Sequence, residues 1–335
     1  MKFDKLKKIF LVAEIGNNHE GSFKLAKKLI LSAKKCGADA VKFQTFIPEK
    51  FVHFSDKKRL SKLKKFQLSF KEFKKLSNFA KKNKIIFFST PLDIESAKFL
   101  NSIQSFFKIS SGDNNFFPLI EKIACLNKDI ILSTGLMTIK EIEKTKKFIF
   151  NIWKKSNFKR KLSILHCVSS YPVEKQNANL LAIKTLKKKF ISCNIGYSDH
   201  TVGITACIAA AALGAKIIEK HFTLDKNYST FRDHKISANP KEFEDLADHI
   251  KSINLMLGDG KKKISKAEKN NIKSMRRSIA VNQNFIKGQK IKKTQLIWLR
   301  PESSYKPGEE KTILNQVLKK NLNKGEFILK KHFKK

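Results

Sequence analysis

Short apolar runs alternate with amphipathic stretches along the first 220 residues of the chain. We predict strands at eight of the apolar runs: Ile9–Ala13, Ala40–Phe43, Ile85–Phe88, Phe106–Ile109, Ile130–Leu132, Leu162–Leu165, Ile191–Ile195 and Ile217–Ile218. Apolar side chains at helical spacing predict helices between most of them, including Ser22–Lys35, Phe70–Lys82, Ile139–Trp153 and Leu180–Lys188. Strands that are apolar throughout and separated by helices are typical of a parallel sheet covered by helices.

The number of these strand–helix units predicts a (β/α)8 TIM barrel, with a doubly wound open sheet as the alternative. Polar side chains stand where the predicted strands end: Glu14, Lys42 with Gln44, Ser89 with Thr90, Ser110 with Ser111, Ser133 with Thr134, His166, Ser198 with His200, and Glu219 with His221. A serine or threonine at one strand end could simply cap the next helix. Charged and imidazole groups at several ends favour a barrel, where all the ends meet on the face that carries chemistry.

The pattern changes after Leu257, which ends the predicted barrel domain of residues 1–257. Residues 258–275 are polar and lysine-rich and are interpreted as a linker. Residues 276–335 are predicted to form a small β-rich domain. Within it Phe285–Ile291 resembles Leu322–Ile328, and a Lys-Gly pair in each copy predicts two related hairpins. A domain of about 60 residues is marginally stable alone, so we expect it to pack on another surface.

The composition limits the classes of partner. The net charge of +41 at first suggests nucleic acid or an anionic membrane. All but six of the 70 basic residues are lysines spread through every predicted helix, so we interpret them as solvated surface and expect neither partner. The longest apolar runs fall short of the ~18 residues of a membrane span, and Ile9–Ala13 is too short for a signal-peptide core. We therefore expect a cytoplasmic protein. Five widely spaced cysteines without a C-x-x-C pair predict neither disulfides nor structural zinc.

Lys42 is the first candidate for chemistry, because it stands inside an apolar strand and a buried lysine is rare without an anionic partner. A second lysine and four hydroxyl groups are expected at the same mouth: Lys108, Thr90, Ser111, Ser133 and Ser198. Ammonium groups and hydroxyl donors together suit a phosphate and a carboxylate. The sequence contains neither G-x-x-x-x-G-K-[ST] nor G-x-G-x-x-G, so no nucleotide cofactor is predicted.

His200 and His221 end neighbouring predicted strands and form a candidate metal site. Two imidazoles with open positions suit a divalent transition ion such as Mn²⁺, Fe²⁺ or Zn²⁺, with water and substrate oxygens completing the shell. Two hydrogen-bonded core histidines are the alternative. In I-E-K-H, Glu219 and His221 share one face of the strand, which favours the metal site.

Seven motifs stand in order along the chain: A-E-I-G-N-N-H-E-G at Ala13–Gly21, V-K-F-Q-T at Val41–Thr45, K-I-S-S-G-D at Lys108–Asp113, L-S-T-G at Leu132–Gly135, H-C-V-S-S-Y-P-V at His166–Val173, G-Y-S-D-H-T at Gly196–Thr201 and I-E-K-H-F-T-L-D-K at Ile218–Lys226. Together they closely resemble the N-acetylneuraminate synthase family of nonulosonate (sialic-acid-type) synthases. The segment from Arg276–Val281 onward resembles the SAF (antifreeze-like) domain of that family. The resemblance covers the whole chain.

The resemblance implies a condensation of phosphoenolpyruvate with an N-acetyl amino-sugar, N-acetylmannosamine or a di-N-acetylated 6-deoxy hexose, with release of phosphate. The implied phosphoenolpyruvate contacts are Lys42, Thr90, Lys108, Ser111, Ser133 and Ser198, and the implied metal ligands are His200 and His221. Mn²⁺ is the first candidate ion, and Mg²⁺, Co²⁺ or Fe²⁺ are alternatives. Positions at the amino-sugar are Glu14, Gln44, Tyr171 and Asp233. Arg300 matches an arginine inserted into the partner subunit's active site, which implies a domain-swapped homodimer.

Either Glu14 or Glu219 is expected to handle the proton of the attacking water or to stabilise the developing cation. The chain departs from the family pattern on the sugar side: Pro301-Glu302 stands where glycine usually follows Arg-Pro, and Phe231–His234 reads F-R-D-H. The resemblance therefore specifies the type of reaction more closely than the identity of the amino-sugar. Two other functions stay open: another barrel carbon–carbon bond-forming enzyme, such as a keto-acid phosphate synthase or a lysine aldolase, and a non-catalytic binder of anions or nucleic acid.

Overall fold

A parallel sheet of eight strands is the centre of the fold in the computed structural model, which describes residues 8–333. The strands are β1 (Phe10–Gly16), β2 (Ala40–Thr45), β3 (Ile86–Pro91), β4 (Phe106–Ile109), β5 (Asp129–Ser133), β6 (Leu162–Cys167), β7 (Asn194–Asp199) and β8 (Ile217–His221). Their order is β3-β2-β1-β8-β7-β6-β5-β4, and β3 lies beside β4. The Gln104 side chain joins these two ends by accepting a 2.8 Å hydrogen bond from the Ser89 N–H. The predicted (β/α)8 barrel is confirmed, and the alternative open sheet is not formed.

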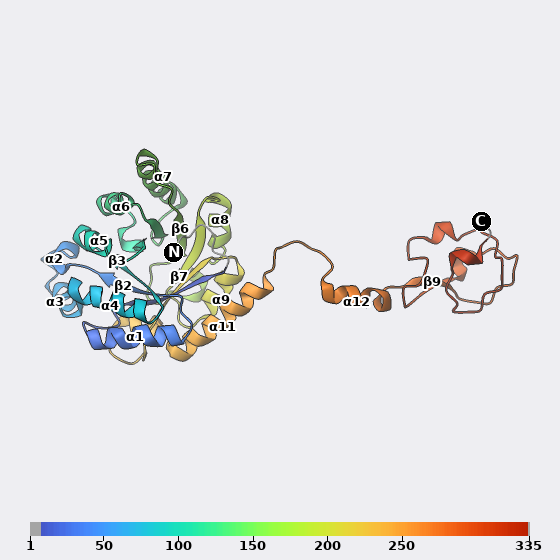
Figure 1. Cartoon of the computed structure of the whole chain (residues 1–335), viewed down its shortest axis with the longest axis horizontal. Coiled ribbons are helices and arrows are strands. Elements are labelled where there is room, and N and C mark those ends of the chain that lie inside the picture. The colour runs from blue at the N-terminus through green and yellow to red at the C-terminus, as the bar shows by residue number, and fades with distance from the viewer. Residues whose placement is uncertain (1–7, 334–335) are drawn as a thin grey trace. The chain divides into compact units, whose positions relative to one another are not determined.

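Helices cover the outside of this barrel (Figure 1). They are α1 (Phe23–Lys35), α4 (Phe70–Lys82), α5 (Ile94–Leu100), α6 (Phe117–Ala124), α7 (Ile139–Lys155), α8 (Ala182–Lys189), α9 (Thr205–Ala212) and α11 (Pro240–Met256). Three further helices lie in the connections that follow β2 and β8: α2 (Pro48–Phe51), α3 (Lys57–Phe66) and α10 (Arg232–Ile236). The four helices predicted by name are confirmed to within two residues at each end. Capping boxes fix two of their starts, where Ser69 pairs with Glu72 and Thr138 pairs with Glu141. Within residues 8–333 none of the helices is both long and apolar enough to cross a membrane.

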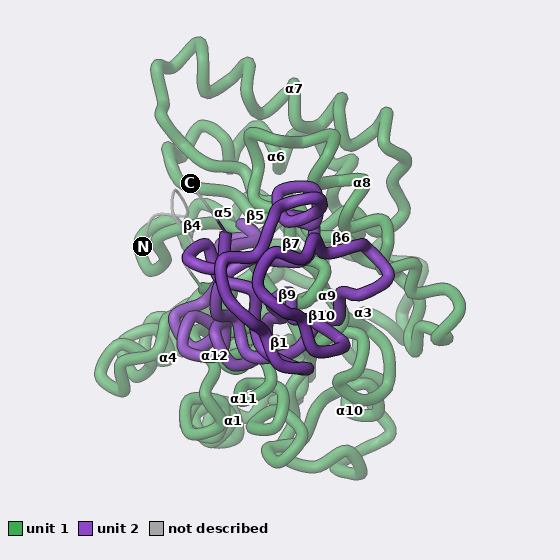
Figure 2. The backbone as a smooth tube through the Cα atoms, turned by 90° about the vertical axis from the view of Figure 1, so that its right-hand side faces the viewer, with its two compact units in different colours: residues 1–258 green, residues 259–335 purple. Residues whose placement is uncertain are grey.

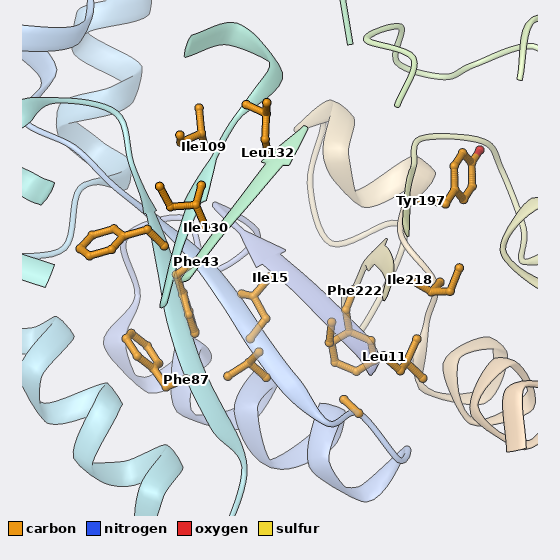
Figure 3. Packing of buried hydrophobic residues seen from close by; sticks show 14 of the residues in the cluster. Leu11, Ile15, Phe43, Phe87, Ile109, Ile130, Leu132, Tyr197, Ile218 and Phe222 are labelled. Atoms are coloured by element: carbon orange, nitrogen blue, oxygen red, sulfur yellow. The ribbon is translucent and has the colours of Figure 1, made fainter. Parts of the chain in front are cut away.

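Alternation along each strand divides the core into two layers. Leu11 and Phe43 belong to the layer between the sheet and the helices (Figure 3). The inner layer fills the barrel with one or two side chains from most strands: Phe10, Val12, Ala40, Phe88, Phe106, Ile131, Leu165 and Ile217. Because side chains alternate, the next inward position after Val12 is Glu14 and the one after Ala40 is Lys42. We call this inner layer the apolar plug. The polar side chains lie directly beyond it, toward the carboxyl ends of the strands.

Several strands run further toward their carboxyl ends than predicted, so polar residues expected after them belong to the strands themselves. Glu14 lies within β1, Ser133 ends β5, and His221 ends β8. The prediction for β7 is wrong by about three residues at its start, because Ile191 is 88% exposed just after α8 and the strand begins at Asn194. The last residues of a strand do not continue its apolar run when they are polar and point into the barrel mouth, so an apolar run underestimates the length of such a strand.

Residues 259–335 form a second compact unit, which Figure 2 colours purple. It contains helix α12 (Lys266–Met275), which lies within the predicted linker, and the antiparallel strands β9 (Ser278–Val281) and β10 (Leu296–Leu299). The two repeat segments do not form separate hairpins as predicted. They pair with each other, because Phe285 and Leu322 exchange backbone hydrogen bonds of 2.8 and 3.0 Å. Ten buried apolar residues, among them Ile279 and Ile328, give this unit its own core.

Candidate active site

A cavity of about 800 Å³ opens at the carboxyl ends of the barrel strands. It brings together the site residues predicted from the sequence, with one exception: its lining includes Glu14, Lys42, Gln44, Thr90, Lys108, Ser111, Ser133, Tyr171, Ser198, His200, Glu219, His221 and Asp233. The exception is Arg300, which follows β10 in the second unit and has an exposed side chain. These residues come from all eight βα segments of the barrel, as expected for the reactive face of this fold.

Four charged side chains form the floor of the cavity directly above the apolar plug. Lys42 Nζ lies 3.2 Å from Glu14 Oε1 and 3.3 Å from Glu219 Oε1. Lys108 Nζ lies 3.3 Å from the same Glu219 oxygen. All four residues are at most 4% exposed. Buried lysine and glutamate side chains require a partner of opposite charge. Because two ammonium groups contact the one Glu219 carboxylate, positive charge remains available to a ligand in the cavity.

The barrel gives the two floor glutamates opposite ionisation behaviour. Burial raises the pKa of Glu14 to about 7, aided by the neighbouring Glu219 and only partly opposed by Lys42. Burial also acts on Glu219, but Lys108, Lys42 and a 2.8 Å hydrogen bond from Ser198 Oγ outweigh it and hold its pKa well below the usual range. Two carboxyl groups with separated pKa values in one site are typical of an acid–base pair with different roles.

Hydroxyl and amide donors surround this floor. Thr90 Oγ1 lies 3.4 Å from Lys42 Nζ, and Ser111 Oγ accepts a 3.1 Å hydrogen bond from the Gly135 N–H. Ser133 Oγ is buried and has no hydrogen-bond partner within the described part of the chain. A Cβ atom at Gly135 would come within 2.2 Å of Ser169 Oγ and 2.7 Å of Ser111 Oγ, so any other residue there would force these hydroxyl groups to move. A free Ser133 hydroxyl in the same cavity as two lysines fits an oxyanion ligand.

His200 and His221 lie side by side at the mouth, with ring centroids 5.4 Å apart. His200 Nδ1 is 2.8 Å from the carbonyl oxygen of Val168, so it carries the proton and leaves Nε2 available to a metal. His221 Nδ1 is buried without a hydrogen-bond partner among residues 8–333, and burial holds its pKa well below the usual range. A neutral His221 ring with a free nitrogen, beside a His200 ring held by the Val168 carbonyl, fits a divalent ion.

These two imidazoles are the protein ligands available at that point. Residues 8–333 contain no group of three or more histidine, cysteine, aspartate or glutamate side chains placed to hold a metal ion. An ion bound by His200 and His221 would keep several positions for water and substrate oxygens, which is the arrangement of an open catalytic site. Glu14 pairs with His221 across β1 and β8, so the carboxyl group lies on the strand beside this position.

The predicted sugar-facing residues lie around the metal pair. The Tyr171 ring is 4.2 Å from the His200 ring, and the Arg232 guanidinium lies 4.5 Å above Tyr171. Asp233 Oδ1 is buried and lacks a hydrogen-bond partner in the described residues, although Arg232 Nε approaches it to 3.4 Å. Gln44 donates to Glu14 at 3.3 Å. Amide, carboxylate and phenol groups within one cavity suit a ligand rich in hydroxyl and acetamido groups.

Sequence reasoning missed several functional positions. Asn17 holds Gln44 through a 2.9 Å hydrogen bond, and Arg232 covers Tyr171. Behind the histidines, Lys220 Nζ lies 2.7 Å from Asp199 Oδ2, and both side chains are fully buried. This pair joins β7 to β8 directly beside His200 and His221. A signal for it exists in S-D-H and E-K-H, where a charged residue precedes each histidine at an outward position.

The chain is similar to several known proteins. The NeuB family profile matches residues 29–262. The chain is 40% identical to the N,N'-diacetyllegionaminic acid synthase of Campylobacter jejuni, over 96% of this chain and 99% of that one, and 33% identical to a pseudaminic acid synthase of the same species, over 99% and 98%. The crystal structure of an N-acetylneuraminic acid (sialic acid) synthetase from Leptospira borgpetersenii in complex with citrate is 38% identical and superposes with a TM-score of 0.73, covering 79% of this chain and 90% of that one. This chain is therefore an enzyme of the NeuB family.

Proposed function

We propose that the enzyme condenses phosphoenolpyruvate with the open-chain aldehyde of an N-acetylated amino-sugar, giving a 2-keto sugar acid and inorganic phosphate. The observation that carries this proposal is the cavity floor, where Lys42 and Lys108 flank Glu219 beside free and bonded hydroxyl groups. Phosphoenolpyruvate bears a phosphate and a carboxylate close together, and two ammonium groups with serine and threonine donors match both. The family membership and the names of the relatives support the same reaction.

In this proposal a divalent ion, Mn²⁺ in the first place, is held by His200 and His221. When bound, it supplies Lewis-acid polarisation of the sugar aldehyde oxygen. The protein's part is to orient both imidazoles and to keep His221 neutral. Burial lowers the pKa of His221, the Val168 carbonyl fixes the tautomer of His200, and the Asp199–Lys220 pair holds the two strands together.

The proposed bond changes balance as follows. The enol C3 of phosphoenolpyruvate attacks the aldehyde carbon and forms the new carbon–carbon bond, while the aldehyde oxygen takes up a proton. Water adds to C2 of the resulting oxocarbenium ion and loses one proton. The C2–O bond to phosphate then breaks, the C2 hydroxyl gives its remaining proton to the departing phosphate, and C2 becomes the ketone. Lys42 and Lys108 stabilise the charge on the phosphate and carboxylate throughout without forming a covalent bond.

Glu14 is the residue we assign to the proton of the attacking water. Its pKa of about 7 lets it accept a proton near neutral pH and return it. Glu219 is less suited to that task, because two lysines and Ser198 occupy one of its oxygens and hold it ionised. We therefore assign Glu219 to positioning the lysines and to stabilising the positive charge that develops on C2.

The test is phosphate release from phosphoenolpyruvate labelled with ¹⁸O in the bridging oxygen. We expect release that requires an N-acetylated amino-sugar, stops with a chelator, returns with Mn²⁺ and carries the label into phosphate. Unlabelled phosphate would contradict the C–O cleavage. Sugar-dependent turnover without phosphoenolpyruvate would indicate an aldolase instead. Binding without turnover that falls steeply with salt would indicate a non-catalytic anion binder.

A further inference from the structure

One carboxylate oxygen outside the cavity holds both ends of a short stretch that lines it. Residues 230–233 all line the cavity. Ser229 Oγ, directly before this stretch, donates a hydrogen bond to Glu20 Oε1, and His234 Nε2, directly after it, lies 3.1 Å from the same oxygen. Glu20 stands in the loop between β1 and α1, outside that lining. It can therefore act on a ligand only through the stretch that it holds.

Neighbouring residues fix the loop that carries Glu20. Directly after it, Gly21 packs so closely on the end of α3 that a Cβ atom there would come within 2.2 Å of the Lys65 carbonyl oxygen. Two residues before it, Asn18 Nδ2 donates a 2.9 Å hydrogen bond to the carbonyl oxygen of Phe222. The Glu20 side chain is 19% exposed. Its carboxylate is thus held in place on the barrel and differs from the mobile charges of the surface.

The donors and acceptors around His234 indicate that its ring carries two protons. The residue is 1% exposed. Its Nδ1 lies 2.7 Å from Thr223 Oγ1, and that hydroxyl group donates its only proton to the carbonyl oxygen of Asp225 at 3.0 Å. Nδ1 is therefore the donor to Thr223 Oγ1. An ionised Glu20 can only accept, so Nε2 is a donor as well. A ring that donates from both nitrogens is an imidazolium, and Glu20 supplies the partner that a buried charge requires.

The stretch held in this way belongs to the sugar-facing side of the cavity. Asp233 Oδ1 is buried and has no hydrogen-bond partner among the described residues. Burial raises the pKa of Asp233, and cations that include Arg232 and His234 partly oppose that rise. An ionised Asp233 accepts hydrogen bonds, which suits the hydroxyl and amide donors of an amino-sugar. Lys42 and Lys108, which we assign to phosphoenolpyruvate, stand on other strands, β2 and β4.

We infer that Glu20 and His234 are positioning residues, which together with Ser229 and Thr223 form a carboxylate–imidazolium clamp that fixes residues 230–233 at the cavity and sets the affinity for the amino-sugar. This inference rests on the proposed function. Loss of the clamp frees the stretch that faces the sugar and leaves the floor of the cavity in place. It should therefore weaken sugar binding selectively.

The kinetic test compares Glu20→Gln and His234→Gln with the wild type by phosphate release, with N-acetylmannosamine and a 2,4-diacetamido-2,4,6-trideoxy hexose as the sugars. Each variant should raise the KM for the sugar at least about tenfold, as expected for a lost charge-assisted hydrogen bond, and leave the KM for phosphoenolpyruvate within about twofold. The double variant should be no more than about twofold worse than either single one, because both changes remove the same pair. Glu174→Gln is the matched control, since Glu174 is an exposed loop glutamate that also accepts hydrogen bonds from two side chains, Gln176 and Asn177.

Two further measurements do not depend on turnover. Backbone amides of residues 225–236 should exchange their hydrogens at least about tenfold faster in Glu20→Gln than in the wild type, while the barrel strands keep their protection. In ¹H–¹⁵N spectra of the histidine rings at neutral pH, the signals that disappear in His234→Gln should show a proton on both nitrogens in the wild type.

Each contrary result has a distinct meaning. A neutral His234 ring would overturn the carboxylate–imidazolium clamp, and so would wild-type sugar KM and wild-type exchange in both variants. Equal rises in the KM for the sugar and for phosphoenolpyruvate would indicate a general loss of structure and overturn the inference as well. Ser229→Ala, which keeps the ion pair, replaces a variant that melts below the assay temperature and should raise the KM for the sugar by a smaller factor. Absence of phosphate release by the wild type would overturn the proposed function, whereas exchange and ring protonation would still decide whether the clamp exists.

Discussion

At the scale of single residues, the protein environment strongly changes the acidity of the Glu14 carboxyl group. Its pKa is raised to about 7 mainly by burial, so the carboxyl group is protonated below that pH and ionised above it. If Glu14 acts as the base, kcat should rise with pH through a limb near pH 7. Glu14→Gln should remove the limb and lower kcat by about 10²- to 10⁴-fold. A pH profile of kcat at saturating substrates checks this, and a limb that persists in the variant would refute the assignment.

The same shift has a consequence for stability. Because the folded pKa lies above the ordinary value of 4.5, the folded state binds a proton more tightly than the unfolded state. The stabilisation from protonated Glu14 is complete below about pH 4.5 and is lost as pH rises through about 7. Glu14→Gln should therefore weaken the decline in the free energy of unfolding between these pH values, as urea titrations at several pH values would measure.

His221 is expected to matter for the metal and little for folding. Its ring lies at the cavity mouth and its Nδ1 is without a hydrogen-bond partner in the described residues, so truncation removes few native interactions. His221→Ala should abolish Mn²⁺-dependent turnover and weaken Mn²⁺ binding in calorimetry, while the melting temperature changes by only a few degrees. His249→Ala, at an exposed position on α11, is the control. Wild-type turnover at limiting Mn²⁺ would exclude His221 as a ligand.

At the scale of elements, the sequence allowed the barrel and the cavity floor to be predicted for one physical reason. Apolar runs mark the strands, and alternation then decides which polar residue faces inward after the plug, as with Glu14 after Val12. The part of the cavity lining that contains Phe66 and Phe231 could not be predicted in this way. It depends on the path of the connection from β2 to α4, and Phe66 and Phe231 are far apart in the sequence with no periodic pattern to relate them. The Asp199–Lys220 ion pair was also not predicted. Its two residues directly precede His200 and His221 in the sequence, but their side chains face the helices and not the cavity.

That pair is predicted to hold β7 and β8 together. Lys220 Nζ contacts Asp199 at 2.7 Å with both side chains fully buried, and Asp199 also accepts hydrogen bonds from Tyr197 Oη and the Thr201 N–H, each 2.9 Å long. Lys220→Met would leave a buried carboxylate without its cation and should cost about 3–5 kcal/mol of unfolding free energy. The matched control is Lys226→Met, whose partner Glu242 is about one-third exposed, with an expected loss below about 1 kcal/mol. Similar losses in chemical denaturation of the two variants would contradict this ranking.

At the scale of the whole molecule, the net charge of +41 is conspicuous, but we expect most of the lysines that cause it to contribute little to activity. Lys74, Lys75 and Lys81 are exposed on α4, on the outside of the barrel. Changing all three to glutamine should leave kcat/KM for phosphoenolpyruvate within about twofold at 0.15 M salt, because exposed charges beyond about 8 Å are largely screened. Initial rates at 0.02 and 0.15 M salt measure this. A large loss confined to low salt would instead assign these lysines to steering the anionic substrate.

Arg300 is the predicted site residue that the barrel itself does not supply. It lies in the second unit, which has a core of its own around Ile279 and Ile328, and Arg300 is exposed just after β10. A guanidinium group keeps its charge and presents a planar set of donors, which suits an acetamido carbonyl or sugar hydroxyls. We predict that Arg300 completes the site of a partner subunit in a two-fold dimer. Truncation after Gly258 should then preserve Mn²⁺ and phosphoenolpyruvate binding but severely raise the KM for the sugar.

Mixing two inactive variants tests whether Arg300 acts across subunits. His221→Ala lacks the metal site, and Arg300→Ala lacks the arginine. If Arg300 acts in the partner, each mixed dimer contains one complete site, since the intact barrel of one chain meets the intact arginine of the other. Random exchange makes half of the dimers mixed, so about a quarter of wild-type activity should return. Native mass spectrometry of the mixture establishes that exchange has occurred. Mixed dimers without activity would mean that Arg300 acts within its own chain or that the Pro301-Glu302 departure has removed its role.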